Sequence, residues 1–162
     1  MTEARRFDSA GLRAARADKP KARDRDLAQE LGVSEAELLA AHVGHGAIRI
    51  AAHPDRIMPE LAAFGPLMAL TRNESCVIEK TGVYANYSGG GHAGLIANGE
   101  IDLRFFPAHW ITGFALERET AAGLRRYFST AVFSTSAWPA KNPPSSARCS
   151  FCTSTTMSLQ RA

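Results

Sequence analysis

The spacing of apolar residues along the chain changes near residue 66. Before that point apolar positions recur three and four residues apart, as in Leu27, Ala28 and Leu31, which is the spacing of one face of an α-helix. After it, short runs rich in β-branched and aromatic residues are separated by turn residues, which is typical of strands. Helices first and an antiparallel sheet second predict an α+β fold.

The ends of the predicted helices carry recognisable signals. A helix over 22–31 is expected to stop at Gly32, which suits the left-handed C′ position. Ser34 followed three residues later by Glu37 is a capping box, and it opens a second helix that runs to about His42. The remaining predicted elements are a short strand at 47–52, a helix from Pro54 to Gly65-Pro66, and strands at 67–71, 76–84, 91–97, 100–106 and 110–117.

The strongest local signal is a hairpin. Asn98-Gly99 joins the β-rich runs Gly91–Ala97 and Glu100–Phe106, and both residues suit a two-residue turn that needs positive φ. This register pairs His92 with Phe105. Strand alternation then sorts the side chains into two faces. One face, the predicted core, carries His92, Ile96, Ile101, Leu103 and Phe105; the other carries Ala93, Leu95, Asp102, Arg104 and Phe106. The second face is a candidate ligand wall.

Arg104 and Phe106 have two interpretations. In the first they stand on an ordinary exposed strand face, with Arg104 paired to Asp102 or Glu79. In the second they hold a planar ligand, because a guanidinium binds a carboxylate well and a phenyl ring packs against a flat apolar body. Both interpretations stay open on the residues alone.

The two ends of the chain differ from its middle. Residues 1–21 are rich in Arg, Ala and Asp and are expected to form a flexible arm, helical in part. Residues 127–162 contain no carboxylate, and 13 of the 34 residues from Ser129 onward are Ser or Thr. We expect this tail to be of low order, either disordered or translated out of frame. The basic pI of about 9.0 reflects the tail, since Glu119 is the last acidic residue.

Composition narrows the class of protein. The 162 residues fit one domain with a real core, no apolar run is long enough to span a membrane, and the charged N-terminus is no secretory signal. Three cysteines favour a reducing cytoplasm. Cys149 and Cys152 have the spacing of half a zinc site, but a structural zinc needs four ligands, so we expect none. His42 and His45 are expected to lie in a solvated turn, and His109 is expected to be structural.

The helix–glycine–helix segment permits an alternative function, a small helix-turn-helix regulator that binds nucleic acid. Its second helix would have to enter the DNA major groove. That helix carries Glu35, Glu37 and an apolar stripe, which would repel phosphates and offer the bases few contacts. An ordinary helical cover over a core is the better interpretation.

The run LTRNESCVIEKTGVYANYSGGGHAGL, the later IDLRFFPAHW and the upstream ARDRDLAQELGVSEAELLAA closely resemble the first half of the HemS/ChuS-type haemin-degrading factors. The resemblance covers about 22–117 and implies a large antiparallel sheet with helices packed against it. It also implies a cytoplasmic protein that binds haem taken up by bacteria as an iron source. Members of the family store, hand on or degrade haem, with an outside electron donor for degradation.

Carried over by position, Arg104 and Phe106 match an arginine and an aromatic residue near the haem. Ile78 stands where related first halves have a histidine able to ligate iron, and isoleucine has no lone pair to offer. The principal axial histidine of the family belongs to the second half, which is missing here. The resemblance stops after about Arg126, where a strand, a turn and a closing helix are expected. The metal ligand is therefore unknown from sequence.

These observations predict a flexible arm at 1–21, an incomplete HemS-like haem-utilisation domain at 22–126 and a tail at 127–162. The expected function is cytosolic haem binding and delivery by a truncated first half with weakened ligation; whether it is an enzyme stays open. Expected partners are haem and a haem-uptake transporter or electron donor, with no nucleic acid and no membrane insertion. The alternatives are the nucleic-acid regulator and a non-functional, aggregation-prone fragment.

Overall fold

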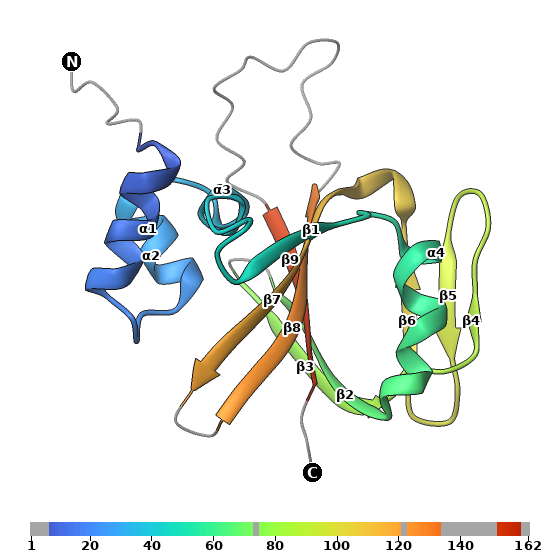
Figure 1. Cartoon of the computed structure of the whole chain (residues 1–162). Coiled ribbons are helices and arrows are strands. Elements are labelled where there is room, and N and C mark those ends of the chain that lie inside the picture. The colour runs from blue at the N-terminus through green and yellow to red at the C-terminus, as the bar shows by residue number, and fades with distance from the viewer. Residues whose placement is uncertain (1–6, 73–74, 121–122, 134–151, 160–162) are drawn as a thin grey trace, which may run out of the picture.

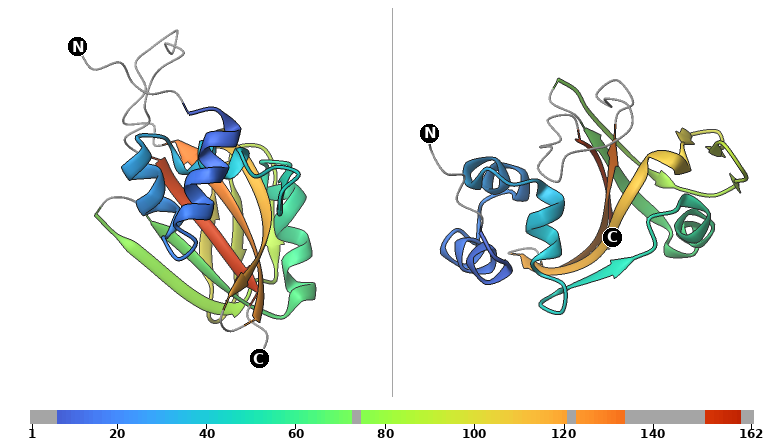
Figure 2. Two further views of the ribbon diagram at one scale, coloured as in Figure 1. Left: turned by 60° about the vertical axis from the view of Figure 1, so that its left-hand side comes forward. Right: turned by 90° about the horizontal axis from the view of Figure 1, so that it is seen from above.

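The computed structural model describes residues 7–72, 75–120, 123–133 and 152–159 and has three layers (Figure 1). A group of N-terminal helices lies on one side of a six-stranded sheet, and a helical segment with a three-stranded sheet lies on the other (Figure 2). The elements are α1 (Ser9–Asp18), α2 (Asp24–Leu31), α3 (Glu35–Ala40), β1 (Ala47–Ile50), α4 (Pro54–Ile57), η1 (Met58–Phe64), β2 (Pro66–Arg72), β3 (Val77–Val83), β4 (Tyr87–Ser88), β5 (Gly94–Ala97), β6 (Asp102–Phe105), η2 (Pro107–His109), β7 (Trp110–Thr120), β8 (Gly123–Phe133) and β9 (Cys152–Leu159). The predicted α+β class, with helices on a large antiparallel sheet, is confirmed.

The N-terminal helices form a small core of their own. Leu12 of α1 is buried with Leu27 of α2 and Leu38 of α3. The predicted helix ends are present: Gly32 has φ +68° at the end of α2, and Ser34 and Glu37 form the capping box of α3. The arm expected at 1–21 is helical in part, as predicted, since α1 is an α-helix that Asp8 caps. Its expected flexibility is wrong for α1, because Leu12 packs with the other two helices.

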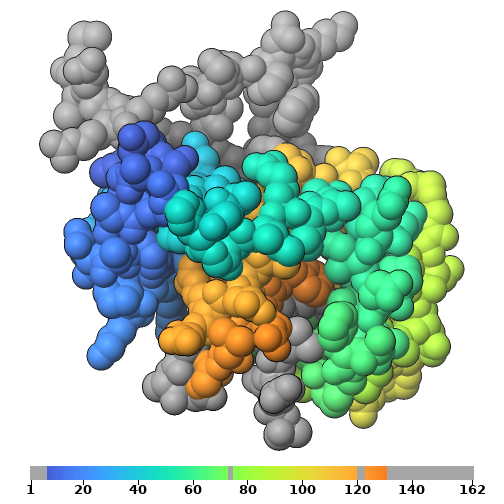
Figure 3. Space-filling model, viewed as in Figure 1, coloured from blue at the N-terminus to red at the C-terminus, as the bar shows by residue number. Residues whose placement is uncertain are grey.

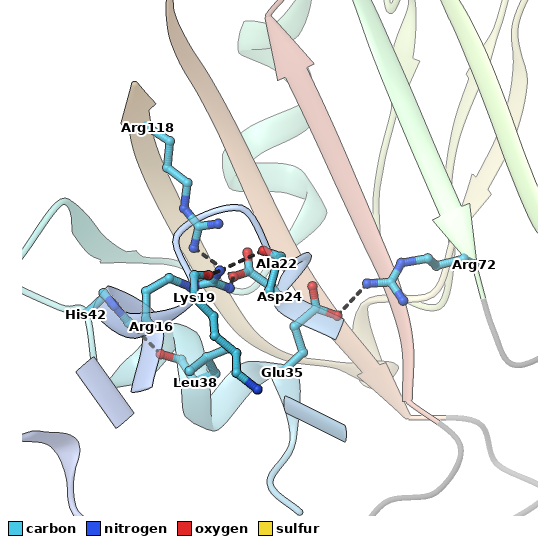
Figure 4. A network of polar contacts seen from close by, with 9 residues as sticks. All are labelled: Arg16, Lys19, Ala22, Asp24, Glu35, Leu38, His42, Arg72 and Arg118. Carbon is cyan, nitrogen blue, oxygen red and sulfur yellow. Dashed lines mark hydrogen bonds and ion pairs between the residues drawn. The ribbon is translucent and has the colours of Figure 1, made fainter. Parts of the chain in front are cut away.

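Side-chain ion pairs fasten these helices to the large sheet (Figure 4). Asp24 accepts hydrogen bonds from Arg16 and, at 2.8 Å, from Arg118 of β7. Glu35 of α3 accepts from Arg72 of β2 at 2.6 Å. These pairs are partly shielded from water. Removing one partner would therefore destabilise the fold, because the remaining charge would have little solvation.

Helix α3 also packs its apolar side on the sheet. Leu39 is buried against Ala47, Phe114 and Leu116. With this face covered and Glu35 in an ion pair, α3 lies against its own sheet and does not stand free as a DNA-recognition helix would.

The large sheet has the strand order β1-β7-β8-β9-β2-β3. The long strands β7 and β8 form a hairpin, and β9 pairs antiparallel with both β8 and β2. The expected low-order tail from residue 127 is therefore wrong for two stretches: β8 continues to Phe133, and Cys152–Leu159 is a strand inside the sheet. Cys149 and the rest of 134–151 lie outside the described residues.

The second core lies between the large sheet and the small β4-β5-β6 sheet. The helical segment α4–η1 runs between them, and Leu61 of η1 packs with Ile96 of β5 and Phe105 of β6. The helix expected after Pro54 is thus confirmed, although most of it is 3-10 helix.

The hairpin differs from its predicted register. The observed pairs are Gly94 with Phe105, Leu95 with Arg104 and Ile96 with Leu103, so the loop has four residues and not two. The side chain of Asn98 causes this, because its Oδ1 accepts from the backbone N–H groups of Glu100 and Ile101. Each pairing moves by two residues, which keeps every strand side chain on its predicted face. Ile96, Ile101 and Phe105 are buried, as expected.

Candidate haem-binding face

Arg104 and Phe106 lie on the outer side of the small sheet. Arg104 is an exposed residue of β6, and Phe106 follows one residue after the strand with an extended backbone and a side chain that is 44% exposed. Because the two residues are two positions apart on extended backbone, their side chains leave the same face. The buried Phe105 between them points to the core.

The guanidinium of Arg104 makes no ion pair or hydrogen bond within the described ranges. The first interpretation, an ordinary strand face, expects Arg104 to pair with Asp102 or Glu79. Neither pair is present in the described ranges. Arg16 and Arg72 behave differently, since both are largely buried and paired with carboxylates. Arg104 is free to bind an anionic group from a ligand.

Two imidazoles flank the ring of Phe106. The ring centroid of His92 lies 6.3 Å from that of Phe106 with the planes at 71°, and His109 lies 6.0 Å away at 38°. The predicted place of His92 on the core face is wrong: it precedes β5 in a turn and is exposed. Strand alternation did not apply to it, because β5 begins only at Gly94.

Neither imidazole has a hydrogen-bond partner among the residues that the structure describes. Their ring nitrogens therefore keep lone pairs for a metal, the usual role of a neutral histidine. No cluster of three or more His, Cys, Asp or Glu residues in the described ranges could hold a metal ion by itself.

One polar contact lies beside the glycine-rich loop that precedes β5. The hydroxyl of Tyr87 donates to Asp55 of α4, and this burial and the nearby carboxylate raise the pKa of Tyr87. A Cβ atom at Gly94 would lie 2.4 Å from the Tyr87 hydroxyl oxygen, and one at Gly89 would lie 2.3 Å from Asp55 Oδ1. Both glycines are needed because a side chain at either position would displace this contact.

Two other candidates for an iron ligand do not belong to this face. Ile78 is 63% exposed on β3, the edge strand of the other sheet. Tyr84 is buried, donates its hydroxyl to the carbonyl of Lys80 at 2.8 Å, and has a pKa raised by burial. A buried tyrosine that is hydrogen-bonded to the backbone has no open side for a ligand.

Comparison with known proteins decides the family. The sequence model of the haemin-degrading HemS.ChuX domain matches residues 32–135. This chain belongs to that family. The HemS-type chain is 43% identical over 112 residues to the hemin transport protein HemS of Yersinia enterocolitica, and the match covers 68% of this chain and 32% of that protein. It therefore spans about a third of the length of this relative.

Solved structures agree with the fold. Holo-PhuS, a heme-binding protein from Pseudomonas aeruginosa, has a TM-score of 0.75 and 36% identity and covers 96% of this HemS-type chain, which corresponds to 42% of PhuS. ChuS, an Escherichia coli heme oxygenase, has a TM-score of 0.65 and 34% identity over 74% of this chain and 36% of its own. ChuX is 10% identical with a TM-score of 0.69 and shares the fold.

The sequence analysis did not predict two features of the candidate site, the place of His109 and one side-chain contact. His109 was expected to be structural, and the contact between Tyr87 and Asp55 joins residues 32 positions apart. A short-range signal for His109 did exist: it lies three residues after Phe106, and the single 3-10 turn η2 brings the two rings together. The tyrosine contact depends on how α4 packs beside the small sheet, which no local pattern predicts.

Proposed function

We propose that this chain binds haem on the outer face of the small sheet and hands it on within bacterial haem uptake. The observation that carries the proposal is an exposed Arg104 with no intramolecular partner in the described ranges, on the same face as the exposed ring of Phe106. Haem presents two carboxylates and a flat apolar body. A guanidinium binds the first, and an aromatic ring packs on the second.

His92 is the residue best placed to reach the iron. A phenyl ring that stacks on haem is parallel to the porphyrin plane, whereas an imidazole that ligates the iron is nearly perpendicular to that plane. The two side-chain rings are then close to perpendicular to each other. The 71° between His92 and Phe106 suits this arrangement, and the 38° of His109 does not. The Tyr87–Asp55 contact joins α4 to β4, the strand that precedes the loop that carries His92.

Binding is expected to be weaker than in a two-half relative. Ile78 supplies no lone pair, and the proposed face is open on one side. Delivery is accordingly the favoured role over degradation. Bound haem would supply the oxygen chemistry of the family, with electrons from an outside donor, while this chain supplies binding and orientation. We place the protein in the cytoplasm, with a haem-uptake transporter or an electron donor as further partner.

An absorbance titration with haemin tests the proposal. The whole chain should give a saturable Soret shift with one haem bound. Arg104→Ala should weaken binding about 10-fold or more, since a charge-assisted contact contributes about 1.5–3 kcal/mol. His92→Ala should change the spin-state bands as well as the affinity. Arg125→Ala is the matched control, because Arg125 is an exposed strand arginine elsewhere in the chain.

Three outcomes would contradict the proposal. A Soret shift that Arg104→Ala and Phe106→Ala leave unchanged would move haem to another site. No shift at all, with poor solubility, would favour the non-functional fragment. Retention on DNA that falls with salt, without a haem spectrum, would favour the nucleic-acid regulator.

A further inference from the structure

We propose that this chain has a second binding site, an apolar cavity that takes an uncharged hydrophobic small molecule. The cavity has a volume of about 740 Å³ and lies between the inner face of β1, β7 and β8 and the segment α4–η1. Figure 3 shows the surface hollowed between the orange strands and the green helical segment. Small-molecule sites in proteins have volumes of about 300–1,000 Å³.

Two apolar walls form the cavity. The strand wall consists of Ile48, Ile50, Ala115 and Phe128, and the helix wall consists of Ile57, Leu61 and Phe64. Ile48 and Phe64 are 62% and 55% exposed, so large apolar side chains reach solvent on both walls. Neighbouring exposed apolar groups beside a cavity are a recognised sign of ligand binding.

The charged residues of the cavity favour an uncharged occupant. They are Arg56, Glu60, Glu117 and Arg126, and all four are exposed. Arg126 and Glu117 neutralise each other at 2.5 Å, and Arg56 and Glu60 add one charge of each sign. A charge buried with the ligand would find no compensating group on the apolar walls, and its desolvation would be costly.

The cavity is separate from the face proposed for haem. Arg104, Phe106 and His92 are absent from its lining, and the described lining residues include no histidine, cysteine or methionine. Histidine, cysteine, methionine and tyrosine are the side chains that commonly ligate haem iron. Of these, the described lining contains only Tyr127. The hydroxyl of Tyr127 belongs to a ring that packs against the α3 side of the sheet. The cavity therefore suits a metal-free apolar molecule.

Fluorescence titration with Nile red, an uncharged dye, tests this inference on the whole chain. We expect saturable binding of one dye, displaced by dodecan-1-ol at a concentration at least ten-fold lower than by dodecanoate. Ala115→Phe should weaken dye binding at least 10-fold because it fills the strand wall. Ile48→Arg should do the same by placing a charge at the exposed edge of the cavity, and it is a mild change for the fold.

Matched variants separate this site from haem binding. Ala97→Phe, on the exposed side of β5, and Arg104→Ala should both bind the dye as the unaltered chain does. Dye binding that survives both Ala115→Phe and Ile48→Arg would overturn the proposal, as would the lack of any saturable binding. Stronger displacement by dodecanoate than by dodecan-1-ol would overturn the uncharged class of ligand.

Discussion

At the scale of single residues, the arginines of this chain divide by their surroundings. Arg16 and Arg72 are largely buried, and each is bonded to a carboxylate that offsets its lost hydration. Arg104 is exposed and solvated, so leaving it unpaired costs the fold little. An arginine with no bonded partner among the described residues is available to a ligand, which is why the proposed haem face centres on it.

Gly94 offers a prediction at the same scale. Gly94→Ala should lower the free energy of unfolding by about 1–3 kcal/mol, because the added Cβ would lie 2.4 Å from the Tyr87 hydroxyl oxygen. Chemical denaturation followed by circular dichroism measures this. Combining the change with Tyr87→Phe should recover part of the loss, since the closest atom is then gone.

The control for that experiment is Gly99→Ala, since a Cβ at Gly99 would meet nothing within 4 Å. It should change the free energy of unfolding by less than about 1 kcal/mol. An equal loss at Gly94 and Gly99 would mean that general glycine effects, and not the Tyr87 contact, explain the result.

At the scale of elements, the hairpin shows how a side chain selects a loop. Asn-Gly predicts a two-residue turn, but the Asn98 side chain bonds forward to two backbone N–H groups and closes a four-residue loop. The resulting change of pairing is even, so the faces of the strands survive it. An odd change would have exchanged Phe105 with Arg104 and Phe106.

Asn98→Ala should therefore destabilise the protein by about 1–2 kcal/mol, because it removes the acceptor for Glu100 and Ile101 and the donor to the carbonyl of Val83. Denaturant titration measures the change. Asn98→Asp keeps the acceptor and should lose less than Asn98→Ala. An equal loss for the two variants would show that the contact to Val83 is the dominant one.

The docking of α3 on the sheet predicts a pH effect. Burial raises the pKa of Glu35, and Arg72 opposes the shift. The folded state therefore holds the Glu35 proton to a higher pH than the unfolded state does. Stability contributed by this group is present at low pH and decreases as pH rises through the raised pKa.

Relative to Glu35→Gln, the unaltered chain should thus become less stable as pH increases from about 4 toward neutrality. Unfolding free energies of both proteins across this range measure the difference. A chain that instead gains stability over the glutamine variant with rising pH would mean that the Arg72 pair outweighs the burial of Glu35.

At the scale of the whole molecule, β9 holds the large sheet together. It lies between β8 and β2, so the strands β1-β7-β8 on one side and β2-β3 on the other share no other pairing in the described sheet. The central strand comes from a segment with no apolar alternation, and the segment remains a candidate for translation out of frame. Neighbouring reading frames that encode no family-like strand and helix would contradict that hypothesis.

Thr156→Pro tests the role of β9. Thr156 pairs with Leu70 on one side and Ser129 on the other, and proline removes a ladder N–H from a central strand. We expect loss of cooperative unfolding by circular dichroism. Thr81→Pro on the edge strand β3 is the control and should be milder. Equal loss of cooperative unfolding in the two variants would mean that β9 is no more important to the sheet than the edge strand β3.

The sequence by itself determined the helix ends, the α+β class and the faces of the hairpin strands, because caps, hydrophobic period and alternation act over a few residues. It also brought Arg104 and Phe106 to one face. Tertiary structure alone decided the position of His92 beside Phe106, the Tyr87–Asp55 contact and the cavity between β1 and η1. No helix in the described ranges is long and apolar enough to cross a membrane.

The physical reason for the division is distance along the chain. A helix cap or an alternating strand is stabilised by neighbours in sequence, so its signal is local. The strand β9 is selected by backbone pairing with two strands from distant segments, and such pairing asks little of the side chains involved. Loops such as the one that carries His92 take their positions from the elements that they connect, and only the assembled layers define those positions.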